Sequence, residues 1–180
     1  QIIEKIVNPT LLALKKKKNP YQGFLYVGLM IKNNKPYLIE YNIRMGDPEC
    51  QVIIPRLKTD LLKILNAAVS NNLNRINIKW KNLKCMTIVM CSKGYPGNYQ
   101  KNKTINLKNI KLKKNLFIYH AGTKILNNNL VSSGGRVLNI SSVGSSFKNL
   151  RNNIIKTIKS INWKFGFFRR DIGWRVIKNK

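Results

Sequence analysis

Residues 38–51, LIEYNIRMGDPECQ, constrain the fold of this chain more than any other segment. The segment opens on an apolar run that predicts a strand, and side chains two apart on a strand share a face. Glu40, Asn42 and Arg44 are therefore expected to point the same way. Four turn-forming residues follow and would carry two further carboxylates on a bend: Gly46, Asp47, Pro48 and Glu49.

This pattern predicts a site for a metal, a phosphate and a cationic or amine substrate. The carboxylate of Glu40 beside the amide of Asn42 makes a hard-oxygen pair suited to Mg²⁺, which usually binds one or two carboxylates and completes its shell with water and phosphates. Arg44 adds a planar fork for a carboxylate or a phosphate. The alternative is an ordinary strand pair that meets a lysine.

The first half of the chain reads as helix, hairpin and helix. Residues 2–17 have helical apolar spacing interrupted by Pro9, which can start a new helix but cannot sit inside one. Residues 23–32 predict a buried strand, and residues 33–36 predict the turn into the site strand. Thr59 is expected to cap a helix with an apolar side.

The second half predicts short strands and one packed helix. Polar residues 70–84 place a domain boundary, and strands are expected at 85–91, 116–120 and 136–142. A helix from about residue 146 has near-perfect apolar spacing, at Phe147, Leu150, Ile154, Ile158 and Ile161. These elements favour an α+β fold.

For several other features we prefer a structural interpretation to a catalytic or binding role. Gly134 and Gly135 lack a phosphate-loop pattern, so a hairpin turn is expected. His120, the only histidine, is expected to be a hydrogen-bonded structural residue rather than a base. Arg169, Arg170 and Asp171 predict a local ion-pair and turn network.

The net charge of +28 and the pI near 10.4 suggest a nucleic-acid partner at first sight. The lysines are diffuse, however, and even the strongest runs, at 15–18 and 111–114, read as a helix end and a loop. The aromatic and basic residues 164–170 resemble an RNA-stacking strand only weakly. We therefore expect solvated charge and no specific nucleic acid, with a basic RNA-binding protein as an alternative.

The three cysteines, Cys50, Cys85 and Cys91, lack CxxC spacing, and the last two are too far apart on one strand to be bonded to each other. Free thiols predict a reducing compartment, so we expect a cytoplasmic protein. No stretch approaches the ~20 apolar residues of a membrane span, so no membrane partner is expected.

The segment from Arg44 to Gln51, RMGDPECQ, resembles the signature of the phosphoribosylamine-glycine ligase family, also called glycinamide ribonucleotide synthetases, in the ATP-grasp superfamily. Met45 departs from the Leu or Phe usual there, a tolerant apolar exchange. Six further motifs also resemble that family and extend the similarity along nearly the whole chain: residues 23–30, 55–62, 92–97, 120–123, 134–138 and 169–173.

The resemblance implies the C-terminal half of an ATP-grasp domain, at 1–80, followed by a small barrel-like, hybrid-type α+β domain at 81–180. The implied activity is ATP-dependent ligation of glycine to 5-phosphoribosylamine, giving glycinamide ribonucleotide, ADP and phosphate in purine biosynthesis. An inactive remnant or structural fragment of the ligase is the alternative.

The resemblance also implies residue roles. Glu40 and Asn42 would bind Mg²⁺ or Mn²⁺, Arg44 would be catalytic and clamp the glycine carboxylate or acyl phosphate, and Asp47 and Glu49 would contact phosphoribosylamine. ATP is the implied co-substrate. The family's N-terminal portion does not precede Gln1, so we expect a truncated, split or partial gene product that needs that portion and is inactive alone.

Overall fold

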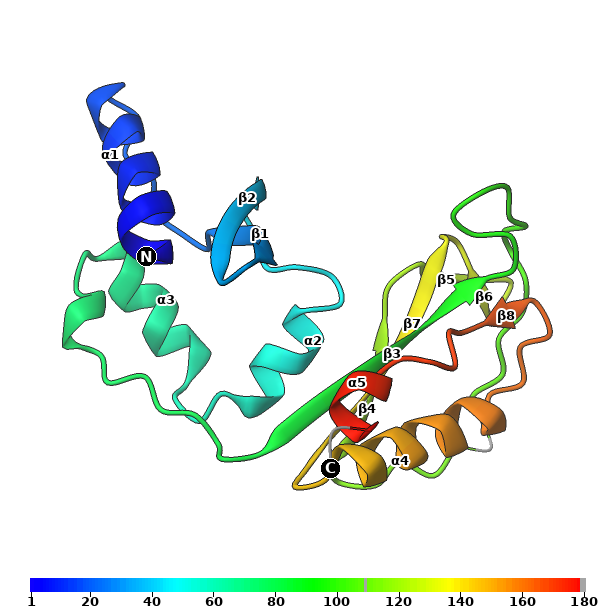
Figure 1. The fold of residues 1–180 in the computed structure, drawn as a ribbon. Coiled ribbons are helices and arrows are strands. Elements are labelled where there is room, and N and C mark those ends of the chain that lie inside the picture. The colour runs from blue at the N-terminus through cyan, green and yellow to red at the C-terminus, as the bar shows by residue number, and fades with distance from the viewer. Residues whose placement is uncertain (109, 179–180) are drawn as a thin grey trace. The chain divides into compact units, whose positions relative to one another are not determined.

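The computed structural model describes residues 1–108 and 110–178 (Figure 1). The chain divides into two compact units, each described by itself. The first unit comprises residues 1–49 and 58–79, and the second comprises residues 50–57 and 80–180. The units separate near the expected residue 80, but the segment 50–57 packs with the second unit. The functional division into 1–80 and 81–180 stays a prediction.

The first unit combines helices with one hairpin. Its elements are the π-helix Ile3–Val7, α1 (Asn8–Lys16), β1 (Tyr26–Lys32), β2 (Lys35–Asn42), α3 (Leu61–Val69) and the 3-10 turn Leu73–Arg75. Pro9 lies in the first turn of α1, which continues directly from the π-helix because Val7 and Asn8 both have helical backbone angles. The helical spacing agrees with the sequence, but the expectation that proline cannot sit inside a helix is wrong here, because the backbone stays helical from residue 2 to residue 16.

The hairpin turns at Asn33 and Asn34, whose φ angles are 51° and 58°. Two successive left-handed residues form the tight turn that matches the twist of paired strands. The expected turn is therefore confirmed. The prediction of a buried strand is wrong, because the strand begins at Tyr26 and the side chains of Met30 and Ile31 are 58% and 56% exposed.

The predicted cap of α3 is also wrong by one residue. Asp60, not Thr59, is the N-cap, and its carboxylate accepts a hydrogen bond from the backbone N–H of Lys63 at 3.0 Å. Thr59 instead accepts from the N–H of Lys79 at 2.7 Å, which ties the start of α3 to a later segment. Both residues can cap, and the tertiary contact selects the acid.

The second unit holds a four-stranded antiparallel sheet in the order β4-β7-β3-β8 and a separate β5-β6 hairpin. Its strands are β3 (Lys84–Ser92), β4 (Leu116–His120), β5 (Thr123–Leu126), β6 (Asn129–Ser132), β7 (Arg136–Gly144) and β8 (Gly166–Phe167). Its helices are α2 (Cys50–Ile53), the 3-10 turn Ile54–Arg56, α4 (Phe147–Ser160) and α5 (Trp174–Lys178). The α+β class is confirmed, and barrel-like closure stays a prediction.

The core of the second unit lies between the sheet and α4 (Figure 1). Alternate side chains of β3 are buried, including Met86, Ile88 and Met90. They meet the apolar side of α4, where Leu150, Ile154 and Ile158 are buried one turn apart. Apolar residues recur every second position on the strand and about every fourth position on the helix, so each element has one apolar face, and the two faces pack together in one core.

The sequence missed β5, β6 and β8, and it misplaced one turn. The hairpin between β5 and β6 turns at Asn127 and Asn128, which have φ angles of 47° and 59°. Gly134 and Gly135 do not form the expected hairpin turn but link β6 to β7, which belong to different sheets. No helix within residues 1–108 and 110–178 has the length and apolar character to cross a membrane.

Candidate metal and phosphate site

Glu40 and Asn42 occupy the C-terminal end of β2 and lie on one face of it. The Asn42 side-chain amide donates a hydrogen bond to the Glu40 carboxylate, with Nδ2 and Oε1 3.0 Å apart. Contact between residues i and i+2 requires both side chains on the same side of the strand. The predicted shared face is therefore confirmed.

Gly28 makes room for the Glu40 side chain. The two residues face each other across the hairpin, and a Cβ placed on Gly28 would lie 2.9 Å from Glu40 Cγ and 3.4 Å from its carbonyl oxygen. A side chain at this position would press directly on the carboxylate's stem. The absence of a side chain at Gly28 thus sets where Glu40 lies.

A β-bulge adds to this positioning. Gly28 pairs with Glu40 but Leu29 pairs with Leu38, so Ile39 is an extra residue in β2 immediately before the carboxylate. Bulges bend a strand, increase its twist and redirect neighbouring side chains. The bulge and the glycine act at the same pair of residues.

The other face of β2 is anchored to α1. The hydroxyl groups of Tyr41 and Thr10 lie 2.5 Å apart, and Thr10 also donates to the carbonyl of Ile6 at 2.8 Å. Tyr41 stands between Glu40 and Asn42 in sequence and so points away from them. This contact fixes β2 against α1 through the face opposite to Glu40 and Asn42.

Arg44 does not extend the strand face, because β2 ends at Asn42 and Arg44 lies in a bend. The expectation that Arg44 shares a strand face with Glu40 and Asn42 is therefore wrong. The Arg44 guanidinium is exposed and donates to the carbonyl of Met45, with Nη1 3.0 Å from the oxygen. The fork lies in the loop after the strand, where its contacts are local.

The turn after Arg44 uses Glu49 to hold its own backbone. The N–H of Gly46 donates to Glu49 Oε2 at 3.2 Å, and a Cβ on Gly46 would lie 2.9 Å from that oxygen. Asp47 is exposed between them. One Glu49 oxygen is thus occupied within the turn, while a carboxylate retains further lone pairs for a ligand.

Within the described residues, no three His, Cys, Asp or Glu side chains gather into a metal-binding group. A site at Glu40 and Asn42 would have two protein ligands. That set suits Mg²⁺, which commonly takes one or two protein oxygens and fills its shell with water and phosphate oxygens. The donor chemistry therefore fits the ion that the sequence predicts.

The C-terminal motifs meet in the second unit through close backbone packing. Ser92 donates from its N–H to the carbonyl of Gly135 at 2.8 Å and from its hydroxyl to the carbonyl of Gly134 at 2.9 Å. A Cβ on Gly135 would lie 2.1 Å from the Tyr95 ring, and one on Gly122 would lie 2.7 Å from the Gly134 Cα. These glycines allow the motifs at residues 92–97, 120–123 and 134–138 to pack closely together.

The structural interpretations of His120 and of residues 169–171 are supported. His120 Nδ1 lies 3.1 Å from Thr123 Oγ1, as expected of a structural histidine. Arg169 Nη2 lies 2.6 Å from Asp171 Oδ2, and this partner holds the pKa of Asp171 below its ordinary value. Arg170 contributes its carbonyl, which accepts from Arg151.

The three cysteines are free thiols, as predicted. Burial raises the pKa of Cys85 above its ordinary value and does the same for Cys91. Both thiols are therefore protonated at neutral pH and poor nucleophiles.

The sequence missed Gly28 as part of the site. It stands in a motif of residues 23–30 and in an apolar strand pattern, where an isolated glycine often marks a bulge or a close approach. The sequence pattern could therefore have indicated Gly28. It could not identify Glu40 as the residue opposite, because the register of the hairpin decides which residue faces the glycine.

Comparison with known proteins matches both parts of the chain to one family. Residues 1–50 match the phosphoribosylglycinamide synthetase ATP-grasp (A) domain, and residues 85–175, just over half of the chain, match the phosphoribosylglycinamide synthetase C domain. These matches agree with the resemblance seen in residues 44–51 and in the later motifs.

Similar proteins carry the corresponding name. A phosphoribosylamine-glycine ligase of Brucella melitensis is 38% identical over 179 residues, which are 99% of this chain and 42% of that protein. The ligase of Agrobacterium fabrum is 41% identical over 97% of this chain and 41% of its own length. The chain thus spans about two fifths of these relatives.

A solved structure gives the same result. The crystal structure of phosphoribosylamine-glycine ligase from Thermotoga maritima superposes with a TM-score of 0.74 at 29% identity, over 94% of this chain and 41% of that one. The agreement covers fold as well as sequence. The chain therefore belongs to the phosphoribosylglycinamide synthetase family and carries residues of its ATP-grasp and C domains.

Proposed function

We propose that this chain forms part of a ligase that joins glycine to 5-phosphoribosylamine, cleaving ATP to ADP and phosphate, in purine biosynthesis. The observation that carries the proposal is the Glu40–Asn42 pair, held on one face of β2 inside the segment that matches the ATP-grasp domain. The family membership indicates which substrates are used, and the Glu40–Asn42 pair offers a site where a metal ion can bind the phosphates of ATP.

The proposed chemistry has two displacements. A glycine carboxylate oxygen attacks the terminal phosphorus of ATP and releases ADP, giving an acyl phosphate. The ribosylamine nitrogen then attacks the acyl carbon, phosphate leaves, and the nitrogen loses a proton to form the amide. Both steps depend on bringing the reactants into line, since phosphoryl transfer is governed largely by positioning and charge stabilisation.

Glu40 and Asn42 would hold Mg²⁺ or Mn²⁺ through their side-chain oxygens. Asn42 now presents its amide nitrogen to the carboxylate, and a half-turn of the amide presents Oδ1 in its place. When bound, the ion neutralises negative charge on the ATP phosphates. Gly28 leaves the carboxylate free of steric pressure at this position.

Arg44, Asp47 and Glu49 would address the other substrates. The exposed Arg44 fork can exchange its bond to the Met45 carbonyl for a bidentate pair with the glycine carboxylate or the acyl phosphate. Asp47 and Glu49 would accept hydrogen bonds from the amine or the sugar hydroxyls. The N-terminal portion of the enzyme would provide the adenine contacts.

The free thiols favour a reducing compartment, and we therefore place the enzyme in the cytoplasm.

The test uses a complete ligase that carries this segment. ADP release is expected to require glycine, phosphoribosylamine, ATP and Mg²⁺ together. Mn²⁺ binding in the presence of ATP, followed by electron paramagnetic resonance, gives a readout besides activity: Glu40→Gln should weaken it, whereas Glu4→Gln on the π-helix should not. Unchanged Mn²⁺ binding in Glu40→Gln, or ADP release without glycine, would reject the proposal.

A further inference from the structure

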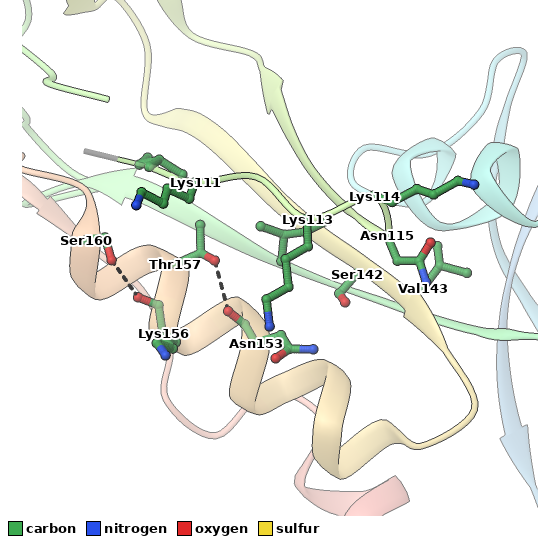
Figure 2. A pocket seen from close by; sticks show the side chains of 12 residues that line it. Lys111, Lys113, Lys114, Asn115, Ser142, Val143, Asn153, Lys156, Thr157 and Ser160 are labelled. Atoms are coloured by element: carbon green, nitrogen blue, oxygen red, sulfur yellow. Dashed lines mark hydrogen bonds between the residues drawn. The ribbon is translucent and has the colours of Figure 1, made fainter. Parts of the chain in front are cut away.

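A cavity in the second unit lies far along the chain from Glu40 and Asn42, between the loop 110–115 and α4 (Figure 2). Its volume is about 520 Å³. Because a water molecule occupies roughly 30 Å³ of liquid, the space admits an anion of many atoms. Four lysines line it: Lys111, Lys113, Lys114 and Lys156.

The α4 wall of the cavity is one polar stripe of the helix. Asn153, Lys156, Thr157 and Ser160 follow the i, i+3, i+4, i+7 spacing that places residues on one side. The core stripe of Leu150, Ile154 and Ile158 runs beside it. Packing of α4 on the sheet therefore turns the polar stripe toward the loop.

The donors available in the cavity are amide and ammonium groups and the Ser142 hydroxyl. Thr157 and Ser160 donate their hydroxyl protons to the helix carbonyls of Asn153 and Lys156, at 3.0 and 3.1 Å, as the dashed lines in Figure 2 show. Lys113 extends from the loop toward Asn153 and Thr157, whereas Lys114 points away (Figure 2). Lys113, Lys111, Lys156 and the Asn153 amide remain to meet a ligand.

Among the described residues, the lining of the cavity offers these lysines no carboxylate. The twelve lining residues include no Asp or Glu. Asp171 is the only acid in the sequence of the second unit, and it is paired with Arg169. Ammonium groups gathered around a cavity without a counter-charge favour a multiply charged anion.

We propose that this cavity binds a small polyphosphate anion. The lining holds no aromatic side chain on which a base could stack. Recognition would therefore rest on the phosphates, whether they belong to an inorganic polyphosphate or to a nucleotide. Its lining residues are different from those proposed for the ligase chemistry, and binding in this cavity does not depend on that chemistry.

The test is calorimetric titration of the 180-residue chain with sodium tripolyphosphate, ATP and orthophosphate, in 0.15 M salt with a chelator present. At that salt concentration the screening length is about 8 Å, so lysines distant from the cavity contribute little. Saturable binding is expected, equally tight for tripolyphosphate and ATP and weaker for orthophosphate. Tighter binding of ATP would show base recognition and overturn the phosphate-only site.

Two matched pairs of variants locate the binding. Lys113→Gln with Lys156→Gln should weaken tripolyphosphate binding roughly tenfold or more, because charged hydrogen bonds are lost. Lys124→Gln with Lys148→Gln removes the same charge from exposed positions outside the cavity and should change it less than about twofold. Equal weakening by both pairs would show diffuse charge only.

A single added carboxylate gives a second, independent measurement. Asn153→Asp places a negative charge in the cavity without removing a lysine, and Asn152→Asp makes the same change one residue away, outside the lining. The first should weaken binding and the second should not. Glu40→Gln should have no effect. Absence of saturable tripolyphosphate binding to the unchanged chain would reject the site.

Discussion

The two compact units differ in where they keep their apolar and acidic side chains. Among the described residues of the first unit, Ala67 alone is a buried apolar side chain, whereas the second unit has a core of thirteen buried residues. The first unit nevertheless contains five of the six acids, and three of these lie within residues 40–49. One unit is organised around packing and the other around an exposed polar site.

Charge distinguishes the units through their acids rather than their cations. The first unit has 12 Lys and Arg residues and the second has 22, in rough proportion to their lengths, against five acids and one acid. The formal net charges are +7 and +21. A general lysine bias accounts for the cations, and the cluster of acids around β2 stands out because it departs from that bias.

The largest expected effect concerns the first unit's site. The 180-residue chain should show no ligase turnover by itself, because it spans about two fifths of its relatives and misplacement of ATP or glycine by about an ångström can cost ~10²-fold. ADP release with glycine, phosphoribosylamine, Mg²⁺ and ATP measures this. Glycine-dependent turnover at an ordinary enzymatic rate would show that the units described here suffice.

Next, Glu40→Ala and Asn42→Ala should separate charge from geometry in a complete ligase that carries this segment. We expect a loss of about 10³-fold in kcat for Glu40→Ala and about 10-fold for Asn42→Ala, because the carboxylate contributes charge to the metal as well as a ligand. Steady-state kinetics at saturating Mg²⁺ give both values. Equal losses would mean that the ligands are misassigned.

The packing contrast can be tested with one substitution in each unit. Ile154→Ala, at a side chain with 0% exposure, should lower the free energy of unfolding by about 2–5 kcal/mol. Ile39→Ala, at a side chain that is 62% exposed, should change it by less than about 0.5 kcal/mol. Urea unfolding followed by circular dichroism measures both. A comparable loss from Ile39→Ala would show that the first unit has a core of its own.

Gly28→Ala tests the steric setting of Glu40. The new methyl group would stand 2.9 Å from Glu40 Cγ, so the carboxylate must shift. In the complete ligase, the Mg²⁺ concentration for half-maximal rate should rise several-fold, while kcat returns at high Mg²⁺, a pattern that general destabilisation would not produce. Gly144→Ala, which meets only the end of the Leu150 side chain at 3.1 Å, is the control and should leave the requirement unchanged.

The smallest effect belongs to the surface pair of Arg169 and Asp171. The Arg169 guanidinium lowers the pKa of Asp171 from its ordinary value of 3.8 in the folded protein. The carboxylate therefore contributes stability at neutral pH, and this contribution is lost as the pH falls through its folded pKa. Asp171→Asn should lower Tm by at most a few degrees at pH 7, and the difference from the unchanged chain should shrink below about pH 4. A difference that grows in acid would reverse the sign.

Much of the local structure could be predicted from periodicity. The spacing of Leu150, Ile154 and Ile158 predicts α4, and the apolar run from Cys85 to Cys91 predicts β3, because each pattern depends only on its own segment. Short strands such as β8 carry too few residues for a pattern. The cap at Asp60 was mispredicted because Thr59 and Asp60 are both capping residues, and the hydrogen bond to Lys79 engages the threonine elsewhere. The turn at Gly134 was mispredicted because the strands on its two sides pair with other strands, which the local sequence does not specify.

The site shows the same division. The sequence alone determined that Glu40 and Asn42 share a face, because alternation along a strand is a property of the backbone, and the motif around Gly46 determined the family. Only the tertiary structure decided that Gly28 faces Glu40 across a bulge, that Arg44 lies beyond the strand end, and that loop lysines meet a stripe of α4. Those facts depend on register and on the packing of segments distant in sequence, which no single segment specifies.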